Sequence, residues 1–346
     1  MRIEWGIARA VARLVATEPE GGSSLAGDLD AFTDDAVARV TAYTGMRPLR
    51  AIPAPEAITR HAWLDANLAS MGKLLDPVAQ RLAARSKAPA HAPSRVLGGV
   101  LLGAEIGGLT GYLASRVLGQ YELVLLDPAT PERLLFVAPN LRGAARRLDV
   151  DEADLVHWVA FHEVTHAVQF TAVPWLRDHL GGLLGSLLES VDVKVTAKDL
   201  LAGGLPNVRA LAGRVREGGL AMLVAGPERM AILDRVQATM AVVEGHAEHV
   251  MDAVGADALA SLDELRAALD RRRGEKPPGV RLLERLIGLE LKLKQYELGK
   301  SFCDAVVERG GVAALQRVWD APEQLPTLAE LAEPAAWLAR TTPRAA

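Results

Sequence analysis

The sequence has few of the features that mark several classes of protein. Its single cysteine, Cys303, excludes an intramolecular disulfide and a thiolate cluster for zinc. Aromatic residues make up only 4% of the 346 residues while hydrophobic residues make up 50%, which favours packed helices over an aromatic-rich β-sandwich. The formal net charge of −4 lacks the basic excess of nucleic-acid-binding proteins, so we expect no nucleic-acid partner.

The sequence also shows little of the pattern of a secretory leader or of a membrane span. The first 22 residues form an amphipathic helical pattern interrupted by charges, which is typical of a cytoplasmic protein. Residues 96–119 are long enough to cross a membrane and carry glycines at four-residue intervals. Because Glu105 and Arg116 interrupt this run, we expect a buried helix with close glycine contacts and no stable membrane insertion. Reversible membrane association is the alternative.

Helical periodicity and breaker residues predict a mainly α fold. The expected helices lie near 3–17, 30–45, 62–86, 96–119, 174–191, 194–203, 227–254, 257–272 and 280–309, with two short helical turns near the end. The Pro/Ala-rich stretch 86–94 is a linker, which divides an N-terminal helical region, 1–93, from a second region, 94–346. The runs 121–127 and 133–139 are the only strand candidates, so the β element is small.

The stretch "VAFHEVTHAVQF", 159–170, carries the strongest chemical pattern. It lies on a predicted helix that begins after Asp149 or Asp151 and ends before Pro174. His162 and His166 are four residues apart, so they lie on one helix face and can direct ring nitrogens at one ion. Glu163 approaches the same space from the side.

This H-E-x-x-H spacing suits a catalytic zinc ion. Two neutral imidazoles bind the metal, and Glu163 beside it acts as general base towards a bound water and then as proton donor. The chance expectation of the pattern in a chain of this composition is below about 0.02. The alternative is a pair of satisfied core histidines, but an unpaired glutamate and two histidines would be costly to bury in such an apolar helix.

A third zinc ligand must come from elsewhere, because Gln169 and Ala172 occupy the positions of the glycine and the third histidine of a metzincin motif. The best candidate segment is "MAVVEGHAEHVMDAVG", 240–255. Glu244 and Glu248 share one helix face there, so one can bind zinc while the other holds a ligand histidine. The alternatives are His246, His249 and Glu189.

The two motifs together resemble the gluzincin metallopeptidases, whose third ligand is a glutamate on a downstream helix. "EGHAE", 244–248, is similar to their "EGFAE"-like element, whose first glutamate binds the metal. The resemblance therefore implies that Glu244 is the third ligand, and from their positions on the same helix we expect Glu248 and His249 to be supporting residues. The interval between the motifs is longer here than in familiar members, because residues 167–243 intervene.

A narrower resemblance extends over most of the chain. The order of "FHEVTHAVQF", "EGHAEHVMD", "LIGLELKLKQYELGKSFC" and "RVWDAPEQLPTLAELAEPAAWLAR" is similar to a zincin-like hydrolase family of actinobacteria and chloroflexi. Its members are often labelled as associated with biosynthesis of the deazaflavin coenzyme factor-420. The resemblance implies a zincin-like metal-binding domain over 94–346 with a C-terminal helical region, and Zn²⁺ as the metal, but no particular substrate.

Tyr296 is a further candidate, because zinc peptidases often use a tyrosine to donate a hydrogen bond to the developing oxyanion. It lies in "LKLKQYELGKSF", 291–302, and the alternative is a tyrosine packed at the edge of a solvated helix.

These observations lead us to expect a zinc-dependent hydrolase of a peptide or a small amide. The competing hypothesis is a catalytically silent zincin-like protein that binds metal or a partner. The sequence does not indicate an oligomeric state.

Overall fold

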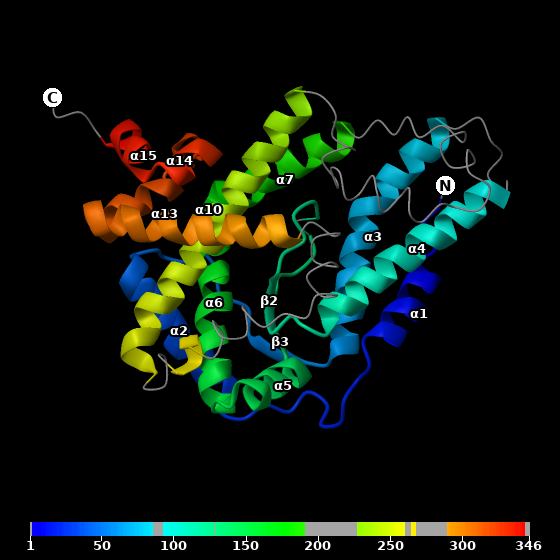
Figure 1. Cartoon of the computed structure of the whole chain (residues 1–346), viewed down its shortest axis with the longest axis horizontal. Helices are drawn as coiled ribbons and strands as arrows, with labels where there is room; N and C mark the ends of the chain where they lie inside the picture. Colours follow the sequence, from blue (N-terminus) through cyan, green and yellow to red (C-terminus); the bar gives the residue numbers. More distant parts are fainter. Residues whose placement is uncertain are drawn as a thin grey trace. The chain divides into compact units, whose positions relative to one another are not determined.

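The computed structural model describes residues 2–85, 93–127, 129–190, 227–259, 264–267 and 289–342, and it is mainly α-helical (Figure 1). The helices are α1 (Trp5–Val15), α2 (Leu29–Thr44), α3 (Arg60–Arg85), α4 (Pro93–Ala114), α5 (Ala138–Leu148), α6 (Glu152–Ala172), α7 (Pro174–Ser190), α10 (Pro227–Ala258), α13 (Leu289–Gln316), α14 (Leu328–Ala332) and α15 (Pro334–Thr341). The strands are β1 (Pro55–Ile58), β2 (Gly119–Glu122) and β3 (Arg133–Val137). The predicted fold class, mainly α with a small β element before the helix of the motif, is confirmed.

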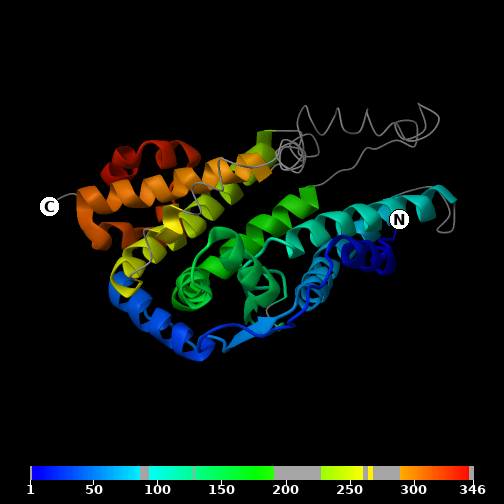
Figure 2. The same ribbon diagram turned by 60° about the horizontal axis from the view of Figure 1, so that its bottom comes forward.

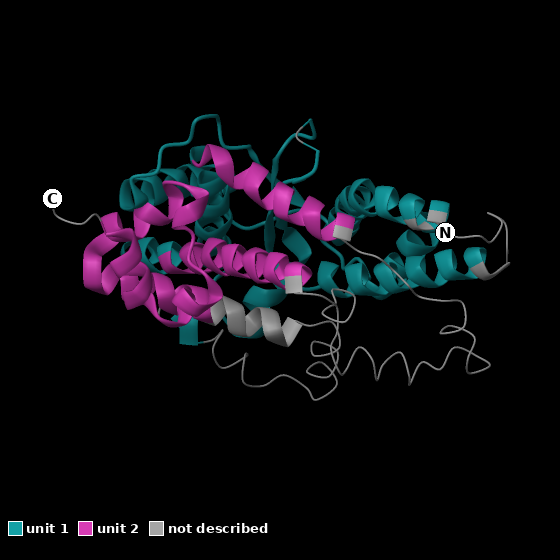
Figure 3. Ribbon diagram, turned by 90° about the horizontal axis from the view of Figure 1, so that it is seen from above, with its two compact units in different colours: residues 1–172, 250–268 teal, residues 173–249, 269–346 magenta. Residues whose placement is uncertain are grey.

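The chain divides into two compact units, which Figure 3 shows in different colours. Unit 1 comprises Met1–Ala172 and Val250–Ala268, and unit 2 comprises Val173–His249 and Leu269–Ala346. Unit 1 contains α1 to α6, the sheet and the C-terminal end of α10, whereas unit 2 contains α7, the rest of α10 and α13 to α15. The predicted division after residue 93 stays a prediction.

The sheet of unit 1 has the order β1-β3-β2. The central strand β3 pairs in parallel with β1 and antiparallel with β2, and its residues 134–137 are completely buried. The expectation of only two strands is wrong, because β1 adds a third. β1 has only four residues and begins at a proline, so its sequence has no strand pattern of its own, and its pairing partner lies far along the chain.

Helix α4 contains the predicted glycine contacts, and it lies beside α1 in both views of the chain (Figure 1, Figure 2). A Cβ atom at Gly103 would be 2.6 Å from the carbonyl oxygen of Glu4, and one at Gly107 would be 2.2 Å from that of Ala8. The two backbones can approach this closely only because glycine faces α1. Among the described residues one helical segment, Arg95–Ala114, is long and apolar enough to cross a membrane. Of its apolar window, 33% is buried.

Helix α6, which carries the motif, is fixed at its start and along one side. The side chain of Asp151 accepts a hydrogen bond from the Asp154 N–H at 3.0 Å, so Asp151 is the helix cap. Asp149 has a left-handed backbone instead and ends α5, a helix that the sequence pattern did not predict. His157 joins α6 to α2, because its ring stacks on Phe32 and its Nε2 atom lies 2.9 Å from Asp35.

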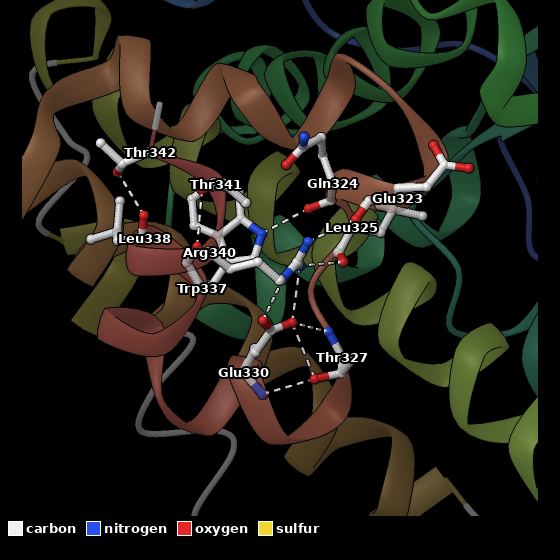
Figure 4. A network of polar contacts seen from close by, with 10 residues as sticks. All are labelled: Glu323, Gln324, Leu325, Thr327, Glu330, Trp337, Leu338, Arg340, Thr341 and Thr342. Atoms are coloured by element: carbon white, nitrogen blue, oxygen red, sulfur yellow. Dashed lines mark hydrogen bonds and ion pairs between the residues drawn. The ribbon is translucent and has the colours of Figure 1, made fainter. Parts of the chain in front are cut away.

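Unit 2 is built around the crossing of α10 and α13. A Cβ atom at Gly299 would be 1.9 Å from the carbonyl oxygen of Ala241, so these helices also touch through their backbones. The two short predicted helical turns near the end are α14 and α15, and a polar network joins them (Figure 4). In that network Arg340 binds Glu330 at 2.6 Å, and the indole of Trp337 donates to the carbonyl oxygen of Gln324 at 2.7 Å.

Other predicted elements agree with the structure or lie outside the described residues. Apart from the unpredicted α5, the described helices in the first 190 residues begin and end within a few residues of the predicted bounds, except that α4 ends at Ala114. Strand β2 starts at Gly119, two residues before the predicted run. The predicted helix 194–203 and most of the predicted linker 86–94 lie outside the described residues, and the last two linker residues, Pro93 and Ser94, begin α4. Cys303 is fully buried, and burial raises the pKa of its thiol far above the usual value, as expected of a core thiol.

Substituting two adjacent glycines of α4 tests the close approach of α1. Gly107→Ala places a Cβ against the backbone of Ala8, so we expect a loss of about 1–3 kcal/mol in the free energy of unfolding. Gly108 has no such neighbour within 4 Å, and Gly108→Ala should stabilise the helix by up to about 1 kcal/mol. Urea denaturation of both variants measures the difference, and equal stabilities would contradict the packing described.

Candidate metal centre

The H-E-x-x-H residues lie on α6 at a buried position of unit 1. Glu163 is 7% exposed and His166 is 9% exposed, while His162 is partly exposed. The helix around them is largely apolar, with Val159, Val164 and most of their neighbours buried. Polar groups in such surroundings need specific partners, because an unpaired buried carboxylate costs several kcal/mol, on the order of a protein's net stability.

The two histidines direct the same ring nitrogen towards each other. The Nε2 atoms of His162 and His166 are 3.2 Å apart, with the rings perpendicular. Two nitrogens that each lie roughly 2.0–2.1 Å from one tetrahedral zinc ion are about 3.3–3.4 Å apart. The predicted pair is therefore spaced as two ligands of one zinc ion are, and the spacing belongs to the protein itself.

Gln169 orients His166 and was not recognised as a site residue from the sequence. The Nδ1–H of His166 donates to the Oε1 atom of Gln169 at 2.9 Å, and Gln169 is completely buried. This bond places the proton on Nδ1 and leaves the lone pair of Nε2 for a metal. Gln169 occupies the position at which a metzincin has glycine, so the departure from that motif has a structural role here. The sequence signal for this role is the position of Gln169 three residues after His166, because residues three apart are neighbours on a helix.

Glu163 is held by strand β2. Its Oε2 atom accepts a hydrogen bond from the backbone N–H of Tyr121 at 2.8 Å, and its side chain lies against Gly119. The ring of Tyr121 stacks on Phe170 at the end of α6, with the centroids 6.0 Å apart. Burial is the main cause that raises the pKa of the Tyr121 hydroxyl well above its usual value, so this tyrosine is a neutral packing residue.

The second motif lies on α10, where its glycine and first histidine have packing roles. A Cβ atom at Gly245 would be 2.1 Å from the carbonyl carbon of Gly299, so "EGHAE" needs glycine where α13 crosses. His246 is completely buried and packs edge-on against Trp319, their centroids 5.1 Å apart. Glu244 and Glu248 are both partly exposed.

His249 is anchored by a carboxylate of α13. Its Nδ1–H donates to Asp304 at 2.6 Å, and Lys300 binds the other oxygen of Asp304 at 2.7 Å. Burial of Asp304 acts to raise the pKa of its carboxyl, but the hydrogen bonds from His249 and Lys300 outweigh burial and hold that pKa below its usual value. Asp304 therefore carries a negative charge beside His249.

The candidate third ligands differ in their positions. Glu244 is partly exposed on α10, whereas His246 is completely buried and His249 is bound to Asp304. Glu189 is exposed at the end of α7. The backbone of Tyr296 lies in α13, but its side chain is outside the described residues.

Comparison with known proteins agrees with this geometry. The model of a family described as zincin-like metallopeptidases matches residues 3–338 of this chain. The chain belongs to the zincin-like metallopeptidase family. A crystal structure from Chloroflexus aurantiacus, described as "a putative hydrolase with a novel fold", is similar to this zincin-like chain, with a TM-score of 0.69 and 30% sequence identity over 98% of both chains. No curated protein matches this chain.

A zincin-like protein is expected to bind a metal ion, typically zinc, and the residues of this site fit that ion. Two neutral imidazoles and a carboxylate are borderline-soft and hard donors that zinc accepts in a tetrahedral site with one open position. The fit rests on the Nε2 spacing of His162 and His166 and on the tautomer that Gln169 imposes.

Removing the acceptor at Gln169 should weaken zinc binding. Gln169→Leu keeps the side-chain volume but no longer accepts the His166 N–H, so we expect zinc affinity to fall by about 10- to 100-fold. Gln169→Glu keeps an acceptor and is the matched control. Competition with a chromophoric chelator measures the affinities, and thermal unfolding of the metal-free variants checks the fold. Equal affinities of wild type and Gln169→Leu would contradict the orienting role.

Proposed function

We propose that this protein is a zinc-dependent hydrolase that cleaves a peptide or a small amide. The observation that carries the proposal is the pair of Nε2 atoms, 3.2 Å apart on α6, with the Glu163 carboxylate on the next residue of the same helix. Imidazoles at this spacing with a neighbouring carboxylate match the requirements of metal-assisted hydrolysis. Membership of the zincin-like metallopeptidase family supports the same reaction class.

In the proposed mechanism His162, His166 and Glu244 hold the metal, and Glu163 moves the proton. When bound, zinc lowers the pKa of a water molecule and polarises the carbonyl group under attack. Glu163 takes the proton from the water on its carboxylate and transfers it to the leaving nitrogen. The surrounding apolar side chains of α6 exclude bulk water, which strengthens these electrostatic interactions.

Glu244 is the third ligand in this proposal, and two observations support it. Its segment "EGHAE" resembles the gluzincin element whose first glutamate binds the metal, and the close crossing of α10 and α13 at Gly245 fixes the adjacent backbone. Glu248, one turn further on, and His249, bound to Asp304, are proposed as supporting residues of the site. Tyr296 stays a proposed oxyanion donor.

The short edge strand of the sheet favours a short substrate. In zincins an extended peptide docks along a sheet edge, and β2 is an edge strand of the sheet in unit 1, beside α6. β2 has only four residues, and the N–H of Tyr121 already binds Glu163. Few backbone groups are left for pairing, which favours a short peptide or a small amide. A cytoplasmic location remains a prediction.

One observation favours the second candidate, a catalytically silent metal-binding protein. The bond from the Tyr121 N–H gives Glu163 a partner within the fold, as a purely structural carboxylate would have. The two candidates differ in whether the Glu163 carboxylate is needed for turnover, because a silent protein has no need of a base.

The variant Glu163→Gln distinguishes the zinc-dependent hydrolase from the catalytically silent protein. The amide cannot take a proton, so we expect zinc content to stay at one ion per chain while peptide cleavage falls by about 10²–10⁴-fold. Zinc is measured by elemental analysis and cleavage by a fluorogenic peptide library. Cleavage by wild type that Glu163→Gln leaves unchanged would refute the role of Glu163, and zinc-loaded wild type without any cleavage would favour the silent protein.

Glu244→Gln tests the third ligand. A neutral amide is a weaker zinc ligand than a carboxylate, so we expect zinc affinity to fall by at least about tenfold, with activity lost in parallel. Glu189→Gln removes an exposed carboxylate of the same type and should change neither property. Chelator titration of both variants measures the affinities, and unchanged binding by Glu244→Gln excludes this residue as a ligand.

A further inference from the structure

Strand β2 presents backbone groups away from the sheet. The N–H of Val137 donates to the carbonyl oxygen of Leu118 at 2.8 Å, and Gly119 pairs with Phe136 in the antiparallel register. Hydrogen-bonded and non-hydrogen-bonded pairs alternate in such a ladder, so Gly119 and Tyr121 occupy non-hydrogen-bonded positions. Their N–H and C=O groups therefore point away from β3. Without another partner, the N–H of Tyr121 would be unsatisfied at a residue that is 9% exposed.

Glu163 is the partner of that N–H group, and Gly119 leaves the space for it. The Oε2 atom of Glu163 accepts the Tyr121 N–H at 2.8 Å. A Cβ atom at residue 119 would be 2.7 Å from Cγ of Glu163 and 2.9 Å from Oε1. The carboxylate therefore lies in the volume that any other side chain at residue 119 would fill.

The two residues of β2 that alternate with these are bound to other elements. The indole N–H of Trp63 donates to Gln120 at 2.6 Å, and the hydroxyl of Ser70 donates to Glu122 at 3.1 Å, both from α3. Arg133 of β3 is 3.5 Å from Glu122. Because β2 is held from this side, it is a fixed support for Glu163.

We propose that Gly119 and the backbone N–H of Tyr121 are positioning residues for the general base. The proposal rests on the proposed function, in which Glu163 moves the proton. The N–H holds Oε2, and the missing side chain at residue 119 lets Oε1 take the orientation in which it accepts the proton. A general base needs such fixed geometry, since a displacement of about 1 Å can cost on the order of 100-fold in rate.

Amide hydrogen exchange tests the contact without any need for activity. On the zinc-loaded full chain, Glu163→Ala should speed exchange of the Tyr121 amide at least about tenfold, because its acceptor is gone. The amide of Gln120, which belongs to a hydrogen-bonded pair of the ladder, is the internal control and should not change. Equal exchange of the Tyr121 amide in wild type and Glu163→Ala overturns the proposal.

Gly119→Ala tests the effect on turnover. The added Cβ meets the flexible side chain of Glu163, so we expect kcat to fall by about 10- to 100-fold while KM, zinc content and melting temperature stay close to wild type. Gly108→Ala, which adds a methyl group in open space of the same unit, should leave kcat unchanged.

Two further comparisons keep the outcomes separate. In a Glu163→Asp background the shorter side chain retracts from residue 119, so Gly119→Ala should then lower kcat by less than about twofold. An equal loss in both backgrounds, or full kcat in Gly119→Ala alone, overturns the positioning role. If wild type cleaves nothing, the proposed function fails, and the exchange measurement still decides whether β2 holds Glu163.

Discussion

The structure of this protein depends on compensating the polar side chains of the H-E-x-x-H motif, which lie within a largely apolar helix. His162, Glu163 and His166 are next to side chains that are almost all buried, so each needs a specific partner or a metal. Gln169 supplies one partner from the same helix, and the N–H of Tyr121 supplies another from β2. The small sheet is therefore part of the site, because its edge strand satisfies the carboxylate that the helix cannot satisfy.

Close backbone contact at glycine is the second constraint, and both units use it. In unit 1 the glycines of α4 face α1, and in unit 2 Gly245 and Gly299 meet where α10 and α13 cross. Such crossings exclude any side chain and leave little freedom for sliding or rotation. The crossing in unit 2 lies beside Glu244, so the residue next to the proposed ligand fixes the helix that carries it. A glycine stripe that suggests a membrane span in isolation thus has a packing explanation in α4.

The parts of the site that could be predicted from sequence are those fixed by helix geometry. His162 and His166 face the same way because they are four residues apart on one helix, and the 3.2 Å between their Nε2 atoms follows from that spacing and from Gln169. β1, the Tyr121 N–H and Asp304 could not be predicted, because each acts through a partner far along the chain. A backbone N–H has no sequence signature, and neither does the empty volume at Gly119 until Glu163 is seen beside it.

The long interval between the two motifs is compatible with a metal site because the second motif is held by contacts within its own unit. A metal site requires that its ligands be held rigidly, and sequence distance has no bearing on that requirement. Residues of "EGHAEH" beside Glu244 are fixed within unit 2: Gly245 by Gly299, His246 by Trp319 and His249 by Asp304. The ligand helix is therefore supported by the chain that follows it, α13 and the turn at Trp319. Part of the interval contributes to this support as well, because Ala241 of α10 meets Gly299 and the indole of Trp175 in α7 donates to the carbonyl oxygen of Trp319 at 3.0 Å.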